Sequence, residues 1–502
     1  MSARLNLAPV KPADLAGLVA RRASGGDRFG GLFASAQSDG STLLWALLAR
    51  QGERELLEAR LSPATKRYKA LTPLLGAASW YEREIHDLFG IEPVGHPRLE
   101  PLVLALGPDE PWRPRPGAGQ SGYDGRRPEM DEGALSSHVS GQGLFTIPHG
   151  PVRSGVFESV EYLVETFGED IAYLQSRVQY KHRGIERRFG ELGLDDGLLL
   201  AERVEGTAAV AHALAYCHAL ESLCSLEVPR SAGLVRVLHA ELERIANHLD
   251  SIARQCEGAG QSVAYARMTV HKERVQRLRA QLCGHRFGRG VVVPGGVSGP
   301  PGVAPAEVLR GLSGLEHAIA GDTRALMGTP SFLDRLRHTG VITPEVAAAH
   351  GALGPVGRGS GLAGDVRSER PYGAYRALGF EPAEPSSVGD ALARQQVRLD
   401  EITSAFHLAR EALDELAEEG NGALWRVALP PVEGLGFGCV EAPQGELVYL
   451  VETRAGRLER VKQRSASFHN LALFPAAFGG DILTDFTFIE ASFGLSQAGA
   501  SG

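Results

Sequence analysis

One short segment in the first half of the chain carries residue types that can move protons. It reads His182-Arg183-Gly184-Ile185-Glu186 and follows a predicted strand. If the segment opens a helix, His182 and Glu186 lie one turn apart on the same face, because side chains four residues apart are neighbours there. Histidine and glutamate are both residue types that can exchange protons. The alternative is an ordinary capped helix start with solvated charges, and the spacing alone does not separate the two.

The cysteines limit the metal chemistry that the chain can support by itself. There are five, at Cys217, Cys224, Cys256, Cys283 and Cys439. None belongs to a C-x-x-C pair, and an odd, scattered set suits reduced thiols better than a disulfide framework. Metal centres held by thiolates usually take them from such closely spaced pairs. No metal site is therefore expected, and Cys217 and Cys224 are better explained as small core residues.

The main structural element is expected to be a pair of helices between Arg203 and Leu249. They are joined at residues 226–229, where Pro229 suits the first turn of the second helix. In that second helix, apolar residues recur every three or four positions: Leu234, Leu238, Leu242, Ile245, Leu249 and Ile252. Polar residues fall between them: Arg236, Glu241, Glu243, Arg244 and Asn247. This alternation predicts one buried face. The first helix is apolar on most sides and is expected deep inside a bundle.

The N-terminal part is expected to form a small α/β domain. Segments 41–48 and 53–61 are predicted strands, and segment 78–91 is a predicted helix with Gly90 as its C-cap. The charged residues of this helix, Glu82, Arg83, Glu84 and Asp87, are typical of a solvated face. A stretch rich in proline, glycine and serine follows. The predicted division is residues 1–112, a linker at 113–142 and a second domain at 143–502.

The second domain is predicted to be mainly helical. Segments 160–167 and 171–178 indicate a β-hairpin, and the predicted helices span 267–284, 305–327, 344–350 and 390–419. Glycine-rich segments at 357–361 and 434–438 lack the strand, loop and helix order of a phosphate loop, so dinucleotide binding is not expected. The fold class is therefore α+β, a small α/β domain followed by a helical bundle with peripheral β-hairpins.

Composition narrows the classes of partner. The formal net charge of -8 and the pI near 6.1 argue against nucleic-acid binding. No apolar run reaches the ~18 residues that crossing a bilayer requires, and the N-terminus lacks a signal pattern. We expect a soluble cytoplasmic protein that docks on a membrane partner.

Several motifs resemble those of one family. The segments R-V-x-G-x-x-x-x-A-H-x-x-A-Y from Arg203 and E-A-P-x-G-E-L from Glu441 are similar to the large subunit of membrane-bound nickel-iron hydrogenases of the formate hydrogenlyase type. They also resemble the homologous 49-kilodalton subunit of respiratory complex I. The segment W-x-E-R-E-x-x-D-L-F-G-I from Trp80 resembles the 30-kilodalton subunit, which hydrogenlyase large subunits carry fused at their N-terminus. The resemblance implies a small iron-sulfur partner subunit, membrane-arm subunits and a peripheral location on the inner face of the cell membrane.

The resemblance also assigns roles to individual positions. It places Arg183 beside the terminal iron-sulfur cluster of the small subunit, where its charge would raise the cluster potential, and it places Glu186 beside a proton path. The positions of the four metal-binding cysteines read Glu205, Ala208, Ser496 and Gly499. Because oxygen ligands cannot replace thiolates for a soft low-valent metal centre, hydrogen chemistry is rejected. The end of the chain resembles a helix at 467–471 and a final strand at 485–489 that return to the active site.

In the complex I subunit the quinone contacts are a histidine, a tyrosine and an aspartate. The corresponding positions here read Arg153, Gly206 and Gly258. The polar residues that remain nearby are His149, Arg153, Glu205 and His212. Reduction of a quinone needs a proton donor within reach of each carbonyl oxygen. The alternatives are that His149 is an ordinary loop residue and that His212 is a satisfied core histidine.

The leading hypothesis is an oxidoreductase subunit that lacks the metal ligands. It would support electron transfer from a partner's iron-sulfur cluster to a quinone or another small acceptor, in a cleft bounded by Arg153, His182, Glu205 and His212. The chain alone would bind no cofactor and would act only in a hetero-oligomer. A buried carboxylate at Glu205 would have a raised pKa or would pair with Arg183 or Arg203. The alternative is a non-catalytic scaffold subunit whose cleft is closed or empty.

Overall fold

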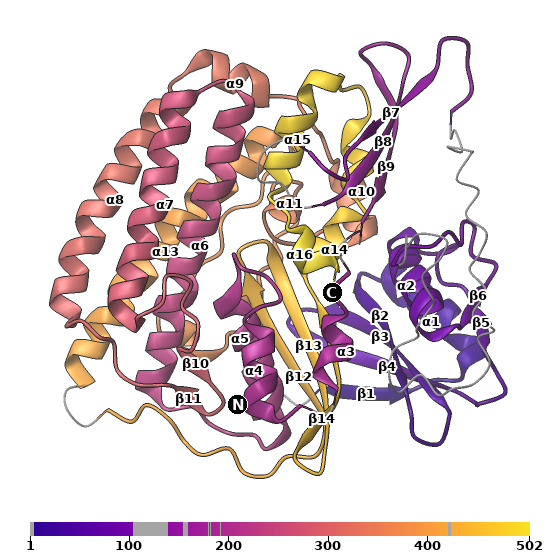
Figure 1. The fold of residues 1–502 in the computed structure, drawn as a ribbon, viewed down its shortest axis with the longest axis horizontal. Helices are drawn as coiled ribbons and strands as arrows, with labels where there is room; N and C mark the ends of the chain where they lie inside the picture. Colours follow the sequence, from indigo (N-terminus) through magenta and orange to yellow (C-terminus); the bar gives the residue numbers. More distant parts are fainter. Residues whose placement is uncertain are drawn as a thin grey trace.

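The computed structural model of the chain describes residues 5–103, 139–153, 159–178, 180, 182–190, 192–419 and 423–501. Most of the predicted linker at 113–142 lies outside the described residues, so the domain boundaries stay a prediction. Figure 1 shows an α/β unit at the N-terminal end, a bundle of long helices on the opposite side and a three-stranded sheet between them. None of the helices in the described ranges combines the length and apolar character that a bilayer-crossing segment requires.

The N-terminal unit contains a four-stranded sheet of order β1-β4-β3-β2. Its elements are β1 (Asn6–Pro9), α1 (Pro12–Ser24), β2 (Arg28–Ala36), β3 (Thr42–Arg50), β4 (Glu53–Leu61), β5 (Arg67–Lys69), α2 (Ser79–Phe89) and β6 (Glu92–Val94). Strand β1 runs parallel to β4, and the other neighbours in this sheet are antiparallel. The predicted strands and helix are confirmed, including Gly90, which ends α2 in the left-handed conformation.

The charged residues of α2 are mostly buried, so the predicted solvated face was wrong. Glu82, Glu84 and Asp87 are 0%, 7% and 3% exposed. Glu82 accepts a hydrogen bond from the backbone amide of Leu71 at 2.8 Å, and Glu84 pairs with Lys462 at 2.7 Å. The sequence pattern could not show this, because the partners come from a loop and from a distant strand. These buried carboxylates keep their place because each is hydrogen-bonded or paired.

The second part begins with an antiparallel sheet that projects beside the bundle (Figure 1). Its strands are β7 (Phe145–His149), β8 (Glu161–Thr166) and β9 (Ile171–Arg177). This confirms the hairpin predicted at 160–178. Two short helices follow, α3 (Ile185–Phe189) and α4 (Leu194–Ala201). The loop that follows β7 extends to the end of the helical bundle.

The bundle consists of long helices that confirm most of the predicted segments. They are α5 (Ala209–Leu223), α6 (Arg230–Gly258), α7 (Ser262–Cys283), α8 (Pro305–Met327) and α13 (Ala391–Glu419). Shorter elements connect them: β10 (Val292–Val293), β11 (Gly296–Val297), α9 (Pro330–Leu336), α10 (Pro344–His350), α11 (Gly354–Arg358) and α12 (Val366–Glu369). Helix α6 is packed between α7 and α13 (Figure 1).

Helix α6 is buried on nearly all sides, so the prediction of one buried face was wrong. Glu241 and Arg244 are 0% and 1% exposed and form an ion pair at 3.1 Å. Glu241 also accepts from Arg367, and Arg236 pairs with Glu221. Charged residues at these positions indicated a solvated side, but they instead meet opposite charges on other elements. Such pairing is what permits charges in a protein interior.

The three-stranded sheet is formed by β12 (Gly434–Ala442), β13 (Gly445–Arg454) and β14 (Arg457–Arg464). The glycines of β12 lie directly against α5. A Cβ atom at Gly438 would collide with the backbone oxygen of Ala215, and one at Gly436 with that of Ala219. These glycines are therefore needed for close packing of a strand on a helix, in agreement with the rejection of a phosphate loop.

The last segment turns back onto the bundle and the β7–β9 sheet. Its helices are α14 (Ala466–Leu471), α15 (Phe486–Phe493) and α16 (Gln497–Ser501). The strand predicted at 485–489 was wrong, because these residues are part of a helix. Phe486, Ile489 and Phe493 are buried at helical spacing in the hydrophobic core. The alternation of Phe486 and Phe488 in the sequence concealed this spacing.

Candidate functional site

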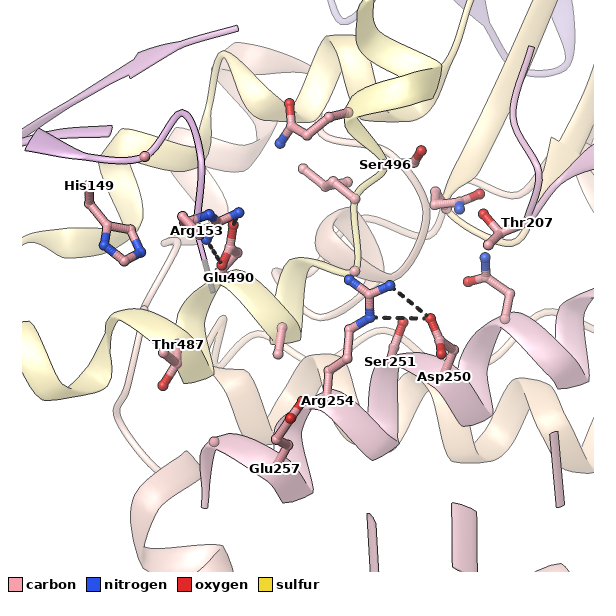
Figure 2. Close-up of a pocket in the computed structure, with 18 of the residues that line it drawn as sticks. His149, Arg153, Thr207, Asp250, Ser251, Arg254, Glu257, Thr487, Glu490 and Ser496 are labelled. Atoms are coloured by element: carbon pink, nitrogen blue, oxygen red, sulfur yellow. Dashed lines mark hydrogen bonds and ion pairs between the residues drawn. The ribbon is translucent and has the colours of Figure 1, made fainter. Parts of the chain in front are cut away.

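A cavity of about 610 Å³ lies where the loop after β7, one side of α6 and the α15–α16 segment meet. Its volume is in the range of small-molecule sites. Figure 2 shows the side chains that line it. The deep residues are Asn247, Ser251, Gln444, Ser496 and Gln497, each no more than 9% exposed. The exposed residues Val152, Arg254, Glu257 and Thr487 also line it and mark its opening.

An ion pair joins the β7 loop to α15 on one wall. Arg153 binds both carboxylate oxygens of Glu490, with Nη1–Oε2 at 2.7 Å and Nη2–Oε1 at 2.9 Å, and the Tyr162 hydroxyl donates to Glu490 at 3.1 Å. His149 lies beside this pair (Figure 2). Partial burial, and next the charge of Arg153, lower the pKa of His149 below its ordinary 6.5. A neutral imidazole offers one N–H donor and one acceptor.

The α6 wall carries a second group of charges. Asp250 accepts from Arg254 one turn later, at 3.1 Å, and from Lys272 of α7 at 2.6 Å. Ser251 lies next to this group and is 5% exposed. Residues Asn247, Ser251, Arg254 and Gly258 follow one another along the same side of the helix. This wall therefore presents hydroxyl and amide groups on its floor and charges at its opening.

Glu205 lies one layer behind the cavity and contacts it through two wall residues. It is 3% exposed. The Thr207 hydroxyl donates to Oε1 at 3.0 Å and the Gln444 amide donates to the same oxygen at 2.7 Å. His212 Nε2 is 3.7 Å from Oε2, and its Nδ1 is 2.7 Å from the Tyr449 hydroxyl. These contacts connect Glu205 to the cavity and to a buried histidine and tyrosine.

The expected pairing of Glu205 with Arg183 or Arg203 was wrong. The Arg183 guanidinium donates to the backbone oxygens of Val204 at 2.6 Å and Ala498 at 2.8 Å. It thus binds the loop that carries Glu205 by its backbone, and it ties that loop to α16. The preference of a guanidinium for several planar acceptors allows this crosslink between segments.

The segment with His182 and Glu186 adopts another geometry than predicted. Helix α3 begins only at Ile185, after Gly184 in the left-handed conformation, so His182 does not share a helical face with Glu186. The ring of His182 bonds the backbone oxygen of Ser501 at 2.7 Å. Glu186 is 3% exposed and accepts from Arg460 and Lys462. Of the predicted site residues, only His149 and Arg153 line the cavity, and Glu205 and His212 lie behind it.

The positions that the resemblance assigned to metal ligands come together. A side chain at Gly499 would collide with the Glu205 carboxylate, and Ser496 lies on the cavity wall. The groups present at the four positions are a carboxylate, a methyl group, a hydroxyl group and a hydrogen atom, a set that does not fit a thiolate-bridged nickel-iron centre. The thiols of the five cysteines form no disulfide, and no group of three or more possible metal-ligating side chains occurs within the described ranges.

Sequence reasoning missed most of the cavity wall. The stripe of polar and small residues on α6, Asn247, Ser251, Arg254 and Gly258, was a readable signal because the positions recur at helical spacing. Glu490 and Gln497 had no such signal, because they follow the segment 485–489 that was predicted as a strand and show no pattern of their own. Gln444 lies in the E-A-P-x-G-E-L motif, which supported the family resemblance but gave no prediction of a site residue.

Comparisons with known proteins define the class of the chain. The family model of the respiratory-chain NADH dehydrogenase 30 Kd subunit matches residues 25–118, and that of the 49 Kd subunit matches residues 259–434. The chain thus joins two units of an oxidoreductase in one polypeptide.

Individual relatives also show similarity to complex I and hydrogenase subunits. The carbon monoxide-induced hydrogenase of Rhodospirillum rubrum is 30% identical over 349 residues, which are 69% of this chain and 96% of the relative. An NADH-quinone oxidoreductase subunit of Anaeromyxobacter dehalogenans is 31% identical over 67% of this chain and 90% of its own length. Formate hydrogenlyase subunit 5 of Escherichia coli is 26% identical over 83% of this chain and 74% of its own length. The chain belongs to the family of complex I 49-kDa subunits and membrane-bound hydrogenase large subunits, and it carries a fused N-terminal unit of the 30-kDa type.

Proposed function

We propose that the chain is a subunit of a membrane-associated oxidoreductase complex in which the cavity binds a quinone or another small electron acceptor. Electrons would come from an iron-sulfur cluster in a small partner subunit, and membrane-arm subunits would hold the assembly at the inner face of the cell membrane. The observation that carries the proposal is the cavity itself, which is open to solvent and has Ser496 on its wall, with Glu205 and Gly499 in contact behind it. The family membership supports the proposal that the chain is one subunit of such a complex.

The wall residues suit a reaction that adds electrons and protons. Reduction of a quinone by two electrons requires one proton at each carbonyl oxygen. His149 and Thr207 lie at opposite ends of the cavity (Figure 2). A neutral His149 can hydrogen-bond one oxygen through its N–H, and it can pass on that proton while its other ring nitrogen takes up a proton from solvent at the opening. The Thr207 hydroxyl, which bonds Glu205, can pass a proton between that carboxyl group and the other oxygen.

A scaffold role is the second candidate, because the usual quinone contacts are replaced by Arg153, Gly206 and Gly258. The test is acceptor reduction by the purified complex carrying Thr487→Trp, which places a bulky ring at the exposed opening of the cavity. Thr403→Trp, on the exposed side of α13, is the matched control. We expect at least a tenfold loss of acceptor turnover, on the order of 1.4 kcal/mol, for Thr487→Trp alone, with the complex intact.

Two further variants test other parts of the proposal. Glu205→Gln tests proton transfer, and Arg153→Ala tests the contribution of the cavity wall. Glu205→Gln keeps a similar shape but removes the ionisable group, so turnover should fall while binding of the acceptor persists. Equal turnover in the wild type and in all three cavity variants would support the scaffold.

A further inference from the structure

Two buried arginines behind the cavity differ from the other buried arginines in the chain. Six arginines are among the largest fully buried side chains: Arg244, Arg358, Arg367, Arg394, Arg398 and Arg464. Four of them form ion pairs with buried carboxylates. Arg394 and Arg398, on successive turns of α13, have no carboxylate oxygen within 4.0 Å in the described part of the chain. The structure therefore buries two positive charges without a direct counterion.

Neutral groups satisfy the hydrogen bonds of both arginines. Arg398 donates to the backbone oxygens of Phe493 at 3.0 Å and Arg394 at 3.1 Å. Arg394 donates to the Ser492 hydroxyl at 2.8 Å and to the backbone oxygen of Gly340 at 2.9 Å. The nearest opposing charge for Arg398, Glu401, is already bound by other basic groups. The carboxylates of Asp390 and Asp481 partly offset the charge of Arg394, so Arg398 is the less compensated of the two. The backbone acceptors of Arg398 orient its guanidinium group but do not cancel its charge.

Only a glycine separates Arg398 from the cavity. A Cβ atom at Gly494 would lie 2.7 Å from Arg398 Nη2 and 2.8 Å from Ser251 Oγ. Gly494 and Ser251 both line the cavity. The Arg398 guanidinium is therefore just behind the floor, in a buried region where water screens its field weakly.

The charges on the cavity wall do not offset this field. Glu490 is neutralised by Arg153, and Asp250 is shared by Arg254 and Lys272. Glu257 lies at the exposed opening, where solvent screens it. The buried carboxylate of Glu205 lies behind a different part of the wall, at Thr207 and Gln444. The uncompensated charge behind the floor at Ser251 and Gly494 is therefore positive.

We propose that Arg398, with Arg394 behind it, makes the floor of the cavity selective for an occupant that is anionic at its inner end. The class of ligand is an aromatic or quinoid acceptor that carries an ionised oxygen or gains one when it is reduced. This inference rests on the proposed function, because it names the acceptor class for the same cavity. Both arginines act through their field, so they are specificity-determining residues without direct contact to the acceptor.

The pKa shifts of the two arginines agree with this proposal. Burial is the largest cause that lowers the pKa of Arg394 to about 9 and that of Arg398 to about 10. Burial has the same effect on Arg358, but there Glu401 and its neighbours raise the pKa above the ordinary value. An anion in the cavity would supply to Arg398 the counterion that the fold omits.

The test compares two probes that differ by one charge. We would measure equilibrium binding of 2-hydroxy-1,4-naphthoquinone, which is ionised at neutral pH, and of its neutral 2-methoxy ether to the purified complex. The wild type should bind the anion at least about tenfold more tightly, as expected for one charge acting across a few ångströms of protein. Arg398→Lys should keep the preference and Arg398→Gln should abolish it.

A second pair of variants leaves the buried arginines in place. Ser251→Asp adds a carboxylate beside Arg398 and should remove the preference, whereas Ser251→Asn adds the same volume without charge and should retain it. Equal affinity of the wild type for both probes, or a preference that survives Ser251→Asp, would overturn the inference. If both probes bind with equal affinity, and the complex reduces the neutral ether in a reaction that Thr487→Trp blocks, the proposed function stands while the inference fails. If neither probe binds, both fail.

Discussion

At the scale of single residues, Glu205 stands at a position that the resemblance assigns to a metal-binding cysteine, but a carboxylate has different chemistry. It lies beside Gly499, as the resemblance to metal-binding relatives requires, but its contacts are Thr207, Gln444 and His212. A carboxylate bonded by a hydroxyl, an amide and an imidazole is suited to exchange protons. Proton exchange at Glu205 is therefore part of the proposed function, at a position that the resemblance assigns to a metal ligand.

A buried histidine on α6 predicts acid sensitivity of the fold. His239 is 1% exposed, and its Nδ1 has no hydrogen-bond partner among the residues that the structure describes. Burial, and next the charge of Arg279, lower its pKa from 6.5 to about 3. Below pH 6.5 the unfolded chain therefore binds a proton that the folded chain does not. The free energy of unfolding should fall by up to about 1.4 kcal/mol per pH unit as the pH decreases toward 3.

The measurement is urea unfolding of the wild type and of His239→Leu between pH 7 and pH 4. In the variant, the free energy of unfolding should depend less steeply on pH, by the contribution of about one titrating group. His317→Leu is the control, because that ring is exposed in the folded chain and should leave the slope unchanged. The same slope in wild type and His239→Leu would contradict the assignment.

At the scale of elements, strand β12 packs directly against helix α5. Gly438→Ala would force a methyl group into the backbone oxygen of Ala215. Because a backbone atom cannot move aside as a side-chain end can, we expect a loss of about 3 kcal/mol or more in the free energy of unfolding.

Gly314→Ala in α8 is the matched control, since a Cβ atom there has open space. It should be neutral or stabilising by up to about 1 kcal/mol, as alanine is the better helix former. Urea unfolding compares the two variants, and similar values for both would show that β12 does not lie as close to α5 as described.

The sequence predicted elements better than it predicted their surroundings. Helix α8 and helix α10 agree with the predicted ranges because each begins with proline at the first turn and has clear periodicity. The burial of α6 could not be predicted, because its charged residues depend on partners far away in the sequence. The cavity wall was missed for the same reason. It is assembled from the β7 loop, α6 and α15, and no local pattern indicates that these segments meet.

At the scale of the whole molecule, buried charges join the N-terminal unit to the central sheet. Glu446 of β13 accepts from Arg28 at 2.7 Å and Arg54 at 2.8 Å in the N-terminal unit, and from Arg464 of β14. Burial alone would raise the pKa of Glu446, but the three guanidinium groups hold it well below its ordinary 4.5. The fused unit is therefore an integral part of the fold.

Glu446→Gln should weaken this connection strongly. It leaves three guanidinium groups around a neutral amide, and removal of one partner from a buried ion pair costs about 3–5 kcal/mol. We expect one cooperative urea transition in the wild type and an earlier, separate transition of the N-terminal unit in the variant. Asp39→Asn, which breaks the exposed pair with Arg60, should change stability by less than about 1 kcal/mol. A single, unshifted transition in Glu446→Gln would refute the connection.

The bond between Arg153 and Glu490 also has a consequence for biosynthesis, because the two residues are 337 positions apart. A ribosome that adds roughly 5–20 residues per second needs about 20–70 seconds to travel from one to the other. During that interval the loop after β7 has emerged without its α15 partner. The cavity is thus among the last parts of the nascent chain to close, after the helices that form its floor have already been made.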